Sequence, residues 1–398
     1  MPSPHAAAPK PVIVTGQQIG AGWTPALSVA KALAALAEAR RTGAEAVYWL
    51  ADEDHDRAEV AGTVGLREGR LIRHRFRFNA PEGTATGWLP WGSSQQGDAE
   101  FLWGEVPAPQ DPTLRGHVLK LGDPLWKLGL RPFSPTDPAL REPIQDDLQR
   151  WRSLDLEASL SLQAERLVAE GAPLPLDPRQ QSAWFSLNPG NGLRKRLEVG
   201  EPCPKGHWLS PGAALRPLMQ SLLLPVEAAV LGPSERAYWR LAEPLWDRLN
   251  LPAPRIIPRP SVIVLPKGSK VSADQLEDLR QGNWRSFSTL ESVLPSQRMG
   301  MGIVPPDLAW GPAIGLRFTR ELDRTIKRLE RLDRRWMRDQ STTRFGMDPE
   351  HLRQRLFPLG KAQERVLPGI FWLRDEALIQ RILGGMDGKA NLILVEES

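Results

Sequence analysis

The sequence has almost no cysteine: Cys203 is the only one among 398 residues. A single thiol excludes a disulfide framework within the chain and any zinc or iron–sulfur site built from several cysteines. Long hydrophobic runs are missing too, because no stretch approaches the roughly 20 apolar residues that a membrane-spanning helix needs. The first 14 residues lack the charged and apolar regions of a secretory signal. We therefore expect a soluble, cytoplasmic protein with no membrane partner.

The sequence also has little net charge. Lysine and arginine number 51 against 47 aspartates and glutamates, which gives a net charge of +4. So small an excess argues against nucleic acid as a partner. With 41% hydrophobic and 25% charged residues the composition is that of a globular protein, and the length predicts two or three modules.

A strand–helix–strand pattern opens the chain. Val12–Val14 is a β-branched run, and apolar residues at three- and four-residue spacing then predict a helix with one buried face. We expect Thr24 to cap the start of this helix, Pro25 to lie in its first turn and Gly43 to cap its end. Residues 46–50 are the second strand of the block.

The same pattern returns in the second half of the chain. Residues 226–231 are a strand candidate, Gly232–Pro233 a turn, and Ser234 an expected cap of the following helix. Further extended segments are predicted at 256–257 and 261–265. Because such blocks build parallel sheets, we predict an α/β protein with a doubly wound parallel sheet that is interrupted by an insertion.

These patterns divide the chain into five ranges. We expect residues 1–65 and 206–265 to form the two halves of the sheet core. Residues 66–205 and 266–316, which are rich in proline and glycine, are the expected insertions, with helical signals at 138–170 in the first. Residues 317–398 form the expected helical C-terminal region.

Two helices are predicted in that C-terminal region, at 318–336 and at 361–383. The first has an apolar stripe among alternating charges. Its basic residues are also consistent with a module that binds nucleic acid or a partner helix. The acidic residues among them argue against nucleic acid, because they would repel phosphates.

Three polar loops follow predicted strands: Gly16–Gln18, Asp52–Asp56 and Gly232–Glu235. Because ligands of open parallel sheets bind at the carboxyl ends of the strands, these loops are the candidate site. Residues 16–18 match neither a GKS/T nor a GxGxxG phosphate loop, and an unliganded polar turn is equally consistent with them.

The acidic loop packs four carboxylates around His55. It can bind a divalent metal, hold an amine, or pair a general base with an orienting carboxylate, and a solvated acidic loop is the alternative without function. Arg216 and Arg259 can bind carboxylate or phosphate, although a structural ion pair is the commoner role of one arginine among many. Cys203 near His207 is expected to be a structural thiol rather than a nucleophile.

The combination of motifs resembles a known family. In order, the chain carries VTGQQIG, YWLADEDHDRAEV, SPGAALRPLMQSLLLP, LGPSERAYW, PRIIPRPSVIVL and LFPLGKAQERV. These segments resemble the cysteine-adding enzymes of bacillithiol biosynthesis, the BshC family. The resemblance runs from about Val12 to Leu383. It departs from the family pattern at Thr24–Ser28 and at Gly212, where the family has asparagine, and the family's coiled coil is shortened here.

The resemblance implies a Rossmann-like core with connecting-peptide insertions and a remnant of a helical coiled coil, in a homodimer. It implies a ligase that joins cysteine through an amide bond to the amine of glucosaminyl-malate, with ATP as the expected activating nucleotide and no metal. The alternatives are a divergent paralogue that acts as another Rossmann-type amine ligase or nucleotidyltransferase, and a non-catalytic interaction module.

Under this reading His55 accepts a proton from the substrate amine, with Asp54 or Asp56 orienting the imidazole. Glu53 is expected to hold the ammonium group before its deprotonation, and Arg216 to bind malate or phosphate oxygens as a catalytic residue. The remaining expected substrate-binding residues are Gly16, Gln17, Gln18, Gln220, Gly232, Glu235, Tyr238, Arg259 and Ser261.

Overall fold

The computed structural model describes residues 9–67, 70–174, 177–178, 183–268, 271, 273–281, 349–388 and 390–397, with single helical positions between 320 and 339. The chain forms two compact units. The first contains the described residues up to Ile263 and those of Glu364–Glu396, and the second contains those of Val264–Gln363 together with Glu397. All loops that the sequence singles out as a candidate site belong to the first unit.

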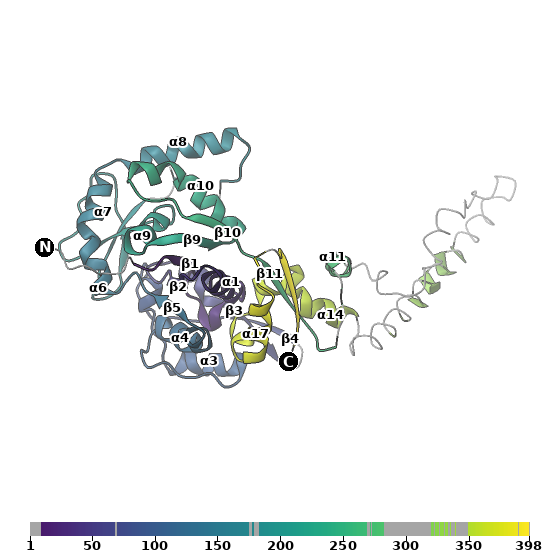
Figure 1. Ribbon diagram of the computed structural model, residues 1–398. Coiled ribbons are helices and arrows are strands. Elements are labelled where there is room, and N and C mark those ends of the chain that lie inside the picture. The colour runs from purple at the N-terminus through teal and green to yellow at the C-terminus, as the bar shows by residue number, and fades with distance from the viewer. Residues whose placement is uncertain are drawn as a thin grey trace. The chain divides into compact units, whose positions relative to one another are not determined.

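A parallel sheet of five strands forms the centre of the first unit (Figure 1). Every neighbouring pair of strands in it is parallel. The order is β10 (Arg255–Pro258), β9 (Val226–Leu231), β1 (Val12–Gln17), β2 (Glu45–Leu50) and β5 (Leu130–Phe133). The predicted α/β class with a parallel sheet is therefore confirmed.

Helix α1 (Leu27–Thr42) connects β1 to β2. Gly43 ends it in the left-handed conformation, with φ 74°, as the sequence predicts. The predicted start at Thr24 is wrong, because Ala26 is the residue that precedes the first helical turn. The Thr24 hydroxyl instead donates to the carbonyl of Ala21 over 2.6 Å, at the end of the short helix η1 (Ala21–Trp23).

Helix α10 (Pro233–Arg248) connects β9 to β10. The predicted cap at Ser234 is wrong by two residues. Gly232 is the cap, and Pro233 occupies the first helical position, where its missing N–H is no loss. The carboxylate of Glu235 accepts a hydrogen bond from the backbone N–H of Gly232 over 2.8 Å, so the helix start is satisfied by its own side chain.

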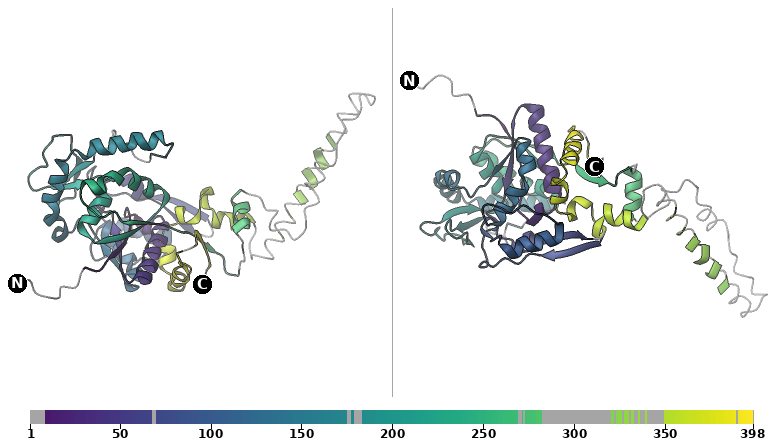
Figure 2. Two further views of the ribbon diagram at one scale, coloured as in Figure 1. Left: turned by 45° about the horizontal axis from the view of Figure 1, so that its top comes forward. Right: turned by 90° about the horizontal axis from the view of Figure 1, so that it is seen from below.

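Helices cover both faces of the sheet (Figures 1 and 2). Alternate strand residues, such as Val14, Val47 and Trp49, belong to one core with α7 (Gln145–Arg152), α8 (Leu156–Ala169), α9 (Arg216–Leu223) and α10. On the opposite face α1 packs against β1, β2 and β9, and α17 (Glu376–Gly384) packs against α1. The sheet is therefore doubly wound, as predicted.

The range 66–205 contributes to the sheet as well as to its surroundings. Its strand β5 pairs with β2, beyond the expected boundary of the core. The helical signals at 138–170 correspond to α6 (Pro138–Arg141), η3 (Glu142–Ile144), α7 and α8. The other elements within this range are β4 (Arg70–Arg75), η2 (Thr86–Trp88), α3 (Ser93–Trp103), α4 (Leu114–Leu121), α5 (Asp123–Lys127), β6 (Trp184–Leu187) and β7 (Arg194–Arg196). Two pairings cross its ends: β4 forms a hairpin with β3 (Gly62–Arg67), which follows α2 (Arg57–Ala61), and β6 and β7 form an antiparallel sheet with β8 (Trp208–Pro211).

The helix predicted at 361–383 is three short helices. These are α15 (Gln363–Val366), α16 (Ile370–Leu373) and α17. Pro368 and Gly369 separate the first two, because proline cannot continue a helix. Asp375 caps α17 by accepting a hydrogen bond from the N–H of Leu378.

The second unit contains α11 (Ala273–Gln281), α14 (Pro349–Leu356) and η6 (Pro358–Gly360). Strand β12 (Leu392–Glu396) pairs with β11 (Ser261–Leu265), whose first residues belong to the first unit. The described positions between 320 and 339 are helical. The rest of the helix predicted at 318–336, the expected coiled-coil remnant, and most of the expected insertion 266–316 lie outside the described residues.

Candidate functional site

The three polar loops lie together at the carboxyl edge of the central sheet, because β1, β2 and β9 run parallel. The side-chain amide of Gln18 donates to the backbone carbonyl of Asp56 over 3.3 Å, which joins the first loop to the second. Gly16 must be glycine for a packing reason: a Cβ there would lie 2.5 Å from the carbonyl oxygen of Trp49.

Lys31 joins the first loop to the third. Its side chain extends from α1, is 0% exposed, and pairs with the Glu235 carboxylate at 2.6 Å. The ammonium also donates to the Gly16 carbonyl and to Oε1 of Gln17. Burial lowers the pKa of Lys31, while Glu235 opposes that change. Gln17 and Glu235, which were expected to bind substrate, are therefore engaged with a buried lysine.

The first carboxylate of the acidic loop, Asp52, holds the loop that follows β5. Its Oδ2 accepts hydrogen bonds from the hydroxyls of Ser134 at 2.6 Å and Thr136 at 3.1 Å, and Arg115 lies 3.8 Å away. The side chain is fully buried. Burial raises the pKa of Asp52 to about 6, although the two hydroxyls and Arg115 favour the charged form.

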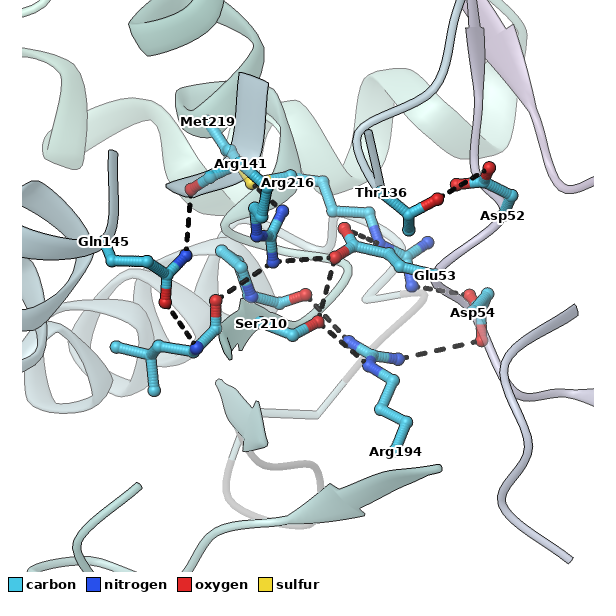
Figure 3. Close-up of polar contacts among 12 residues, drawn as sticks. Asp52, Glu53, Asp54, Thr136, Arg141, Gln145, Arg194, Ser210, Arg216 and Met219 are labelled. Atoms are coloured by element: carbon cyan, nitrogen blue, oxygen red, sulfur yellow. Dashed lines mark hydrogen bonds and ion pairs between the residues drawn. The ribbon is translucent and has the colours of Figure 1, made fainter. Parts of the chain in front are cut away.

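Glu53 is bound inside the protein rather than facing a ligand. Its Oε2 accepts hydrogen bonds from Arg141 and from the Ser210 hydroxyl, both at 2.9 Å (Figure 3). Arg141 and Glu53 are both 0% exposed, so this is a buried ion pair. The expected role of Glu53 in holding a substrate ammonium stays a prediction. In the structure Glu53 positions Arg141 and Ser210.

Asp54 pairs with Arg216 at the start of α9. The guanidinium of Arg216 donates to Oδ2 of Asp54 over 2.6 Å, and Arg194 lies 3.9 Å from Oδ1 (Figure 3). Burial acts to raise the pKa of Asp54, but the two guanidinium groups outweigh it and hold the pKa well below the usual range. Asp54 therefore stays ionised at neutral pH. Burial acts to lower the pKa of Arg216, but the carboxylates of Asp54 and Glu53 outweigh it and raise the pKa.

His55 is held by an arginine. Nη1 of Arg194 lies 3.2 Å from Nδ1 of His55, and because a guanidinium can only donate, Nδ1 accepts. The Phe185 ring packs against the imidazole and carries the Arg194 guanidinium 3.9 Å above its centre. Partial burial and then Arg194 lower the pKa of His55. The imidazole is therefore neutral at pH 7, with its proton on Nε2.

The expected orientation of His55 by a carboxylate is wrong. Nδ1 is 3.9 Å from Asp54, beyond hydrogen-bond distance. The Asp56 carboxylate accepts from the backbone N–H of Glu59 and caps α2. Arg194 takes the orienting place, and it is fixed by its own bonds to the Ser210 hydroxyl and the Pro211 carbonyl.

Two cavities meet at His55. The small cavity has a volume of about 130 Å³, and its lining includes Asp54, His55, Arg194, Gly212 and Arg216. The large cavity has a volume of about 750 Å³, and its lining includes His55, Arg57, Arg75, Arg77 and Glu82. The imidazole of His55 therefore belongs to the walls of both cavities.

Comparisons with known proteins agree with the fold. Residues 201–260, which contain β8, α9, β9, α10 and β10, match the family model "Bacillithiol biosynthesis BshC, N-terminal Rossmann-like domain". A "Putative cysteine ligase BshC" of Thermus thermophilus is 28% identical over 89% of this chain and 77% of its own length. The chain is related to the BshC family. A protein of the same name from Solibacter usitatus is 24% identical over 89% of this chain and 78% of its own length. Another from Shouchella clausii is 26% identical over 64% of this chain and 55% of its own length.

The remaining residues expected to bind substrate in this BshC relative lie in three places. Tyr238, on α10, is half-buried. Burial raises its pKa, and the charges of Glu59 and Glu235 raise it further. Gln220 lies one turn beyond Arg216 on α9, partly exposed. The backbone N–H of Ser261 starts β11 by donating to the carbonyl of Asn391.

Arg259 forms an internal ion pair rather than facing a cavity. It is 3% exposed and pairs with the buried carboxylate of Glu364 at 2.8 Å. The same carboxylate accepts from the backbone N–H of Val262. The expected contact of Arg259 with malate or phosphate oxygens is therefore wrong in this structure.

Sequence reasoning missed Lys31, Arg141, Arg194 and Phe185. Lys31 could have been found from the sequence, because it is a charged residue on the apolar face of a predicted helix. The two arginines and Phe185 lie in the range read as an insertion, and no spacing connects them to the acidic loop. Cys203 behaves as expected for a structural thiol, since burial raises its pKa.

Within the described residues no group of three or more histidine, cysteine, aspartate or glutamate side chains has the arrangement of a metal site. None of the described helices combines the length and the hydropathy that crossing a membrane requires.

Proposed function

We propose that this chain is a ligase that joins L-cysteine through an amide bond to the amine of glucosaminyl-malate, in bacillithiol biosynthesis. The printed names of its relatives and the match of residues 201–260 support the reaction class. The position of both cavities at the carboxyl edge of the parallel sheet supports the location of the site.

The observation that carries the proposal is the charge arrangement of the small cavity. Arg194 and Arg216 supply positive charge, and Asp54 and Glu157 supply negative charge. An α-amino acid carries one group of each sign, so its carboxyl group fits the arginines and its ammonium group fits Asp54.

The volume of the small cavity agrees with an amino acid as small as cysteine. A cavity of about 150 Å³ holds a benzene-sized molecule, and the small cavity measures about 130 Å³. A sugar joined to a dicarboxylic acid is too large for it. The cysteine carboxyl group would therefore lie beside His55, with the amine approaching from the large cavity.

The contact with Arg194 favours a donor role for His55 over the proton-accepting role expected from the sequence. Nδ1 already accepts from Arg194, and Nε2 carries the proton. In the proposed mechanism the amine gives up its proton to solvent, its nitrogen bonds to the carbon of an activated cysteine carboxyl group, and the bond from that carbon to the activated oxygen breaks. Nε2–H donates to the remaining carbonyl oxygen while negative charge develops there, and Arg216 stabilises the same charge.

The described residues near Gly16–Gln18 do not fit the phosphates of ATP. The Lys31 ammonium is fully buried and already paired with Glu235, and the Glu235 carboxylate occupies the N-terminus of α10. A carboxylate at that place repels a phosphate. We therefore derive no step through ATP, and its use remains a prediction from the resemblance, as does the homodimer.

The test is to incubate the purified protein with L-cysteine and glucosaminyl-malate, with and without ATP, and to identify the amide product by mass spectrometry. The wild-type protein should form the product, and His55→Asn should form at least about 100-fold less, as expected when a donor to developing negative charge is removed. Arg73→Ala is the matched control, because this exposed arginine of β4 lines neither cavity.

Absence of product from the folded wild-type protein, with or without ATP, would contradict the proposal. Product formed with a different amine but not with glucosaminyl-malate would favour the divergent amine ligase. No product together with salt-sensitive binding of DNA would favour the interaction module.

A further inference from the structure

The large cavity has features that the cysteine site does not use. Its volume of about 750 Å³ lies within the range of roughly 300–1,000 Å³ that is usual for small-molecule sites. It adjoins α2 and the segment from Arg75 to Phe78 that continues β4. Among the described residues, His55 alone lines both cavities.

Three arginines give this cavity its charge. Arg75 and Arg77 stand two residues apart at the end of β4, on the same side of an extended chain, and Arg57 starts α2. The guanidinium of Arg57 donates to the carbonyls of Ala80 and Pro81. That of Arg75 donates to the carbonyl of Ala58 over 3.0 Å. These bonds hold the guanidinium groups of Arg57 and Arg75 in place, so these two side chains lose less freedom when they bind an anion.

The carboxylates of the large cavity are Asp56 and Glu82. Asp56 is already used as the cap of α2, and Glu82 is exposed at the rim. The lining thus has three positive groups against two negative ones, beside a neutral His55. Such an arrangement complements a molecule with two carboxylates and one ammonium group.

The wall of the cavity is rigid. Phe76 is 2% exposed and packs against Trp91 at 5.2 Å and Trp103 at 5.7 Å between ring centroids. Phe78 is buried beside it. A packed aromatic wall keeps the flanking Arg75 and Arg77 at a fixed spacing, which matches a ligand with two anionic groups at a fixed separation.

We propose that the large cavity binds the dicarboxylate end of the amine substrate, with Arg75 and Arg77 as the principal carboxylate-binding residues. This inference rests on the proposed function for the identity of the substrate. The cavity places the amine on the side of His55 opposite the cysteine. The arginines would then decide which amines the enzyme accepts, since an amine without the dicarboxylate would leave them unpaired.

The test measures binding of L-malate alone, by isothermal titration calorimetry at low ionic strength, without cysteine or ATP. Wild-type protein should bind malate, and Arg75→Ala/Arg77→Ala should bind it at least about tenfold more weakly, because charge-assisted hydrogen bonds are lost. Arg73→Ala, on the same strand but outside the lining, should bind as the wild type does. Glucosamine, which lacks carboxylates, should bind no more tightly to the wild type than to the double variant.

Lack of malate binding by the wild type, or equal binding by the double variant, would overturn the inference. Circular dichroism of all variants identifies any that do not fold, and Arg75→Lys/Arg77→Lys then tests the same contacts with the charge retained. If malate binds through the arginines but no amide product forms with cysteine, the proposed function fails while the dicarboxylate site stands. If product forms and malate binding ignores the arginines, only this inference fails.

Discussion

Replacing Asp52 by asparagine should change how the stability of the protein depends on pH. Asp52 is fully buried, and burial raises its pKa to about 6 from an ordinary 3.8. The folded protein therefore binds a proton at Asp52 between about pH 4 and pH 6 that the unfolded chain has already released. Because the folded state then binds more protons than the unfolded state, the free energy of unfolding falls as pH rises through this window.

The size of the effect follows from the shift. One pKa unit corresponds to about 1.4 kcal/mol, so a shift of about two units corresponds to about 3 kcal/mol. Asparagine has the same shape, and its amide oxygen can accept the hydrogen bonds of Ser134 and Thr136. Its NH₂ group would take the place of Oδ1, which has no hydrogen-bond partner in the described structure. The unpaired NH₂ group would lower the free energy of unfolding by about 1–3 kcal/mol at every pH.

Urea unfolding of wild type and Asp52→Asn, followed by tryptophan fluorescence at pH 4, 5, 6 and 7, measures the difference directly. The variant should be the less stable protein at pH 4. The free energy of unfolding of the variant minus that of the wild type should rise by about 3 kcal/mol from pH 4 to pH 7, because only the wild type acquires a buried charge at residue 52 as the pH rises. All other titrating groups cancel in this comparison. A difference that stays constant with pH, or that falls, would refute the reasoning.

Three further predictions concern the ion pairs and one close packing contact. Arg216→Ala should lower kcat about 100-fold or more with little rise in KM, in steady-state kinetics of amide formation, and a rise in KM alone would make Arg216 a binding group. Arg141→Met should lower the free energy of unfolding by about 3–5 kcal/mol, because it leaves the carboxylate of Glu53 buried without its cation, and a loss below about 1 kcal/mol would contradict the pairing. In urea unfolding, Gly16→Ala should lower the free energy of unfolding more than Gly43→Ala does, because a Cβ at residue 16 would lie 2.5 Å from a carbonyl oxygen of β2. A Cβ at residue 43 meets open space, so that variant should lose only about 1 kcal/mol, through its positive φ. The reverse order of these two losses would contradict the packing argument.

The parts of the fold that could be predicted are those with a local signal. The β-branched run of β1, the spacing of apolar residues in α1, and Gly43 after it all act within a few residues of each other. Strand β5 could not be predicted in this way, because its sequence, Leu-Arg-Pro-Phe, has no β-branched residue and includes a proline. Proline is tolerated there because β5 is the last strand of the sheet.

The candidate site was predictable as a place but not as a set of contacts. Parallel strands bring the loops at 16–18, 52–56 and 232–235 to one edge, whatever their side chains do. Which arginine pairs with which carboxylate depends on distances in space, and Arg141 and Arg194 are 88 and 140 residues from their partners. Glu53 accepts hydrogen bonds from Arg141 and Ser210, and Asp56 accepts one from the backbone N–H of Glu59; spacing in the sequence gives no sign of these bonds.

The position of β1 in the middle of the sheet has a consequence for synthesis of the chain. Its partner β9 begins at Val226, about 210 residues after β1 ends. At roughly 5–20 residues per second, the ribosome needs about 10–40 s to make that stretch. During this interval one edge of β1 has no strand to pair with, and exposed edges of this kind recruit other chains. Nascent chains that stop before Val226 should therefore aggregate or require a chaperone, whereas chains that extend past Arg248 can close the sheet around β1.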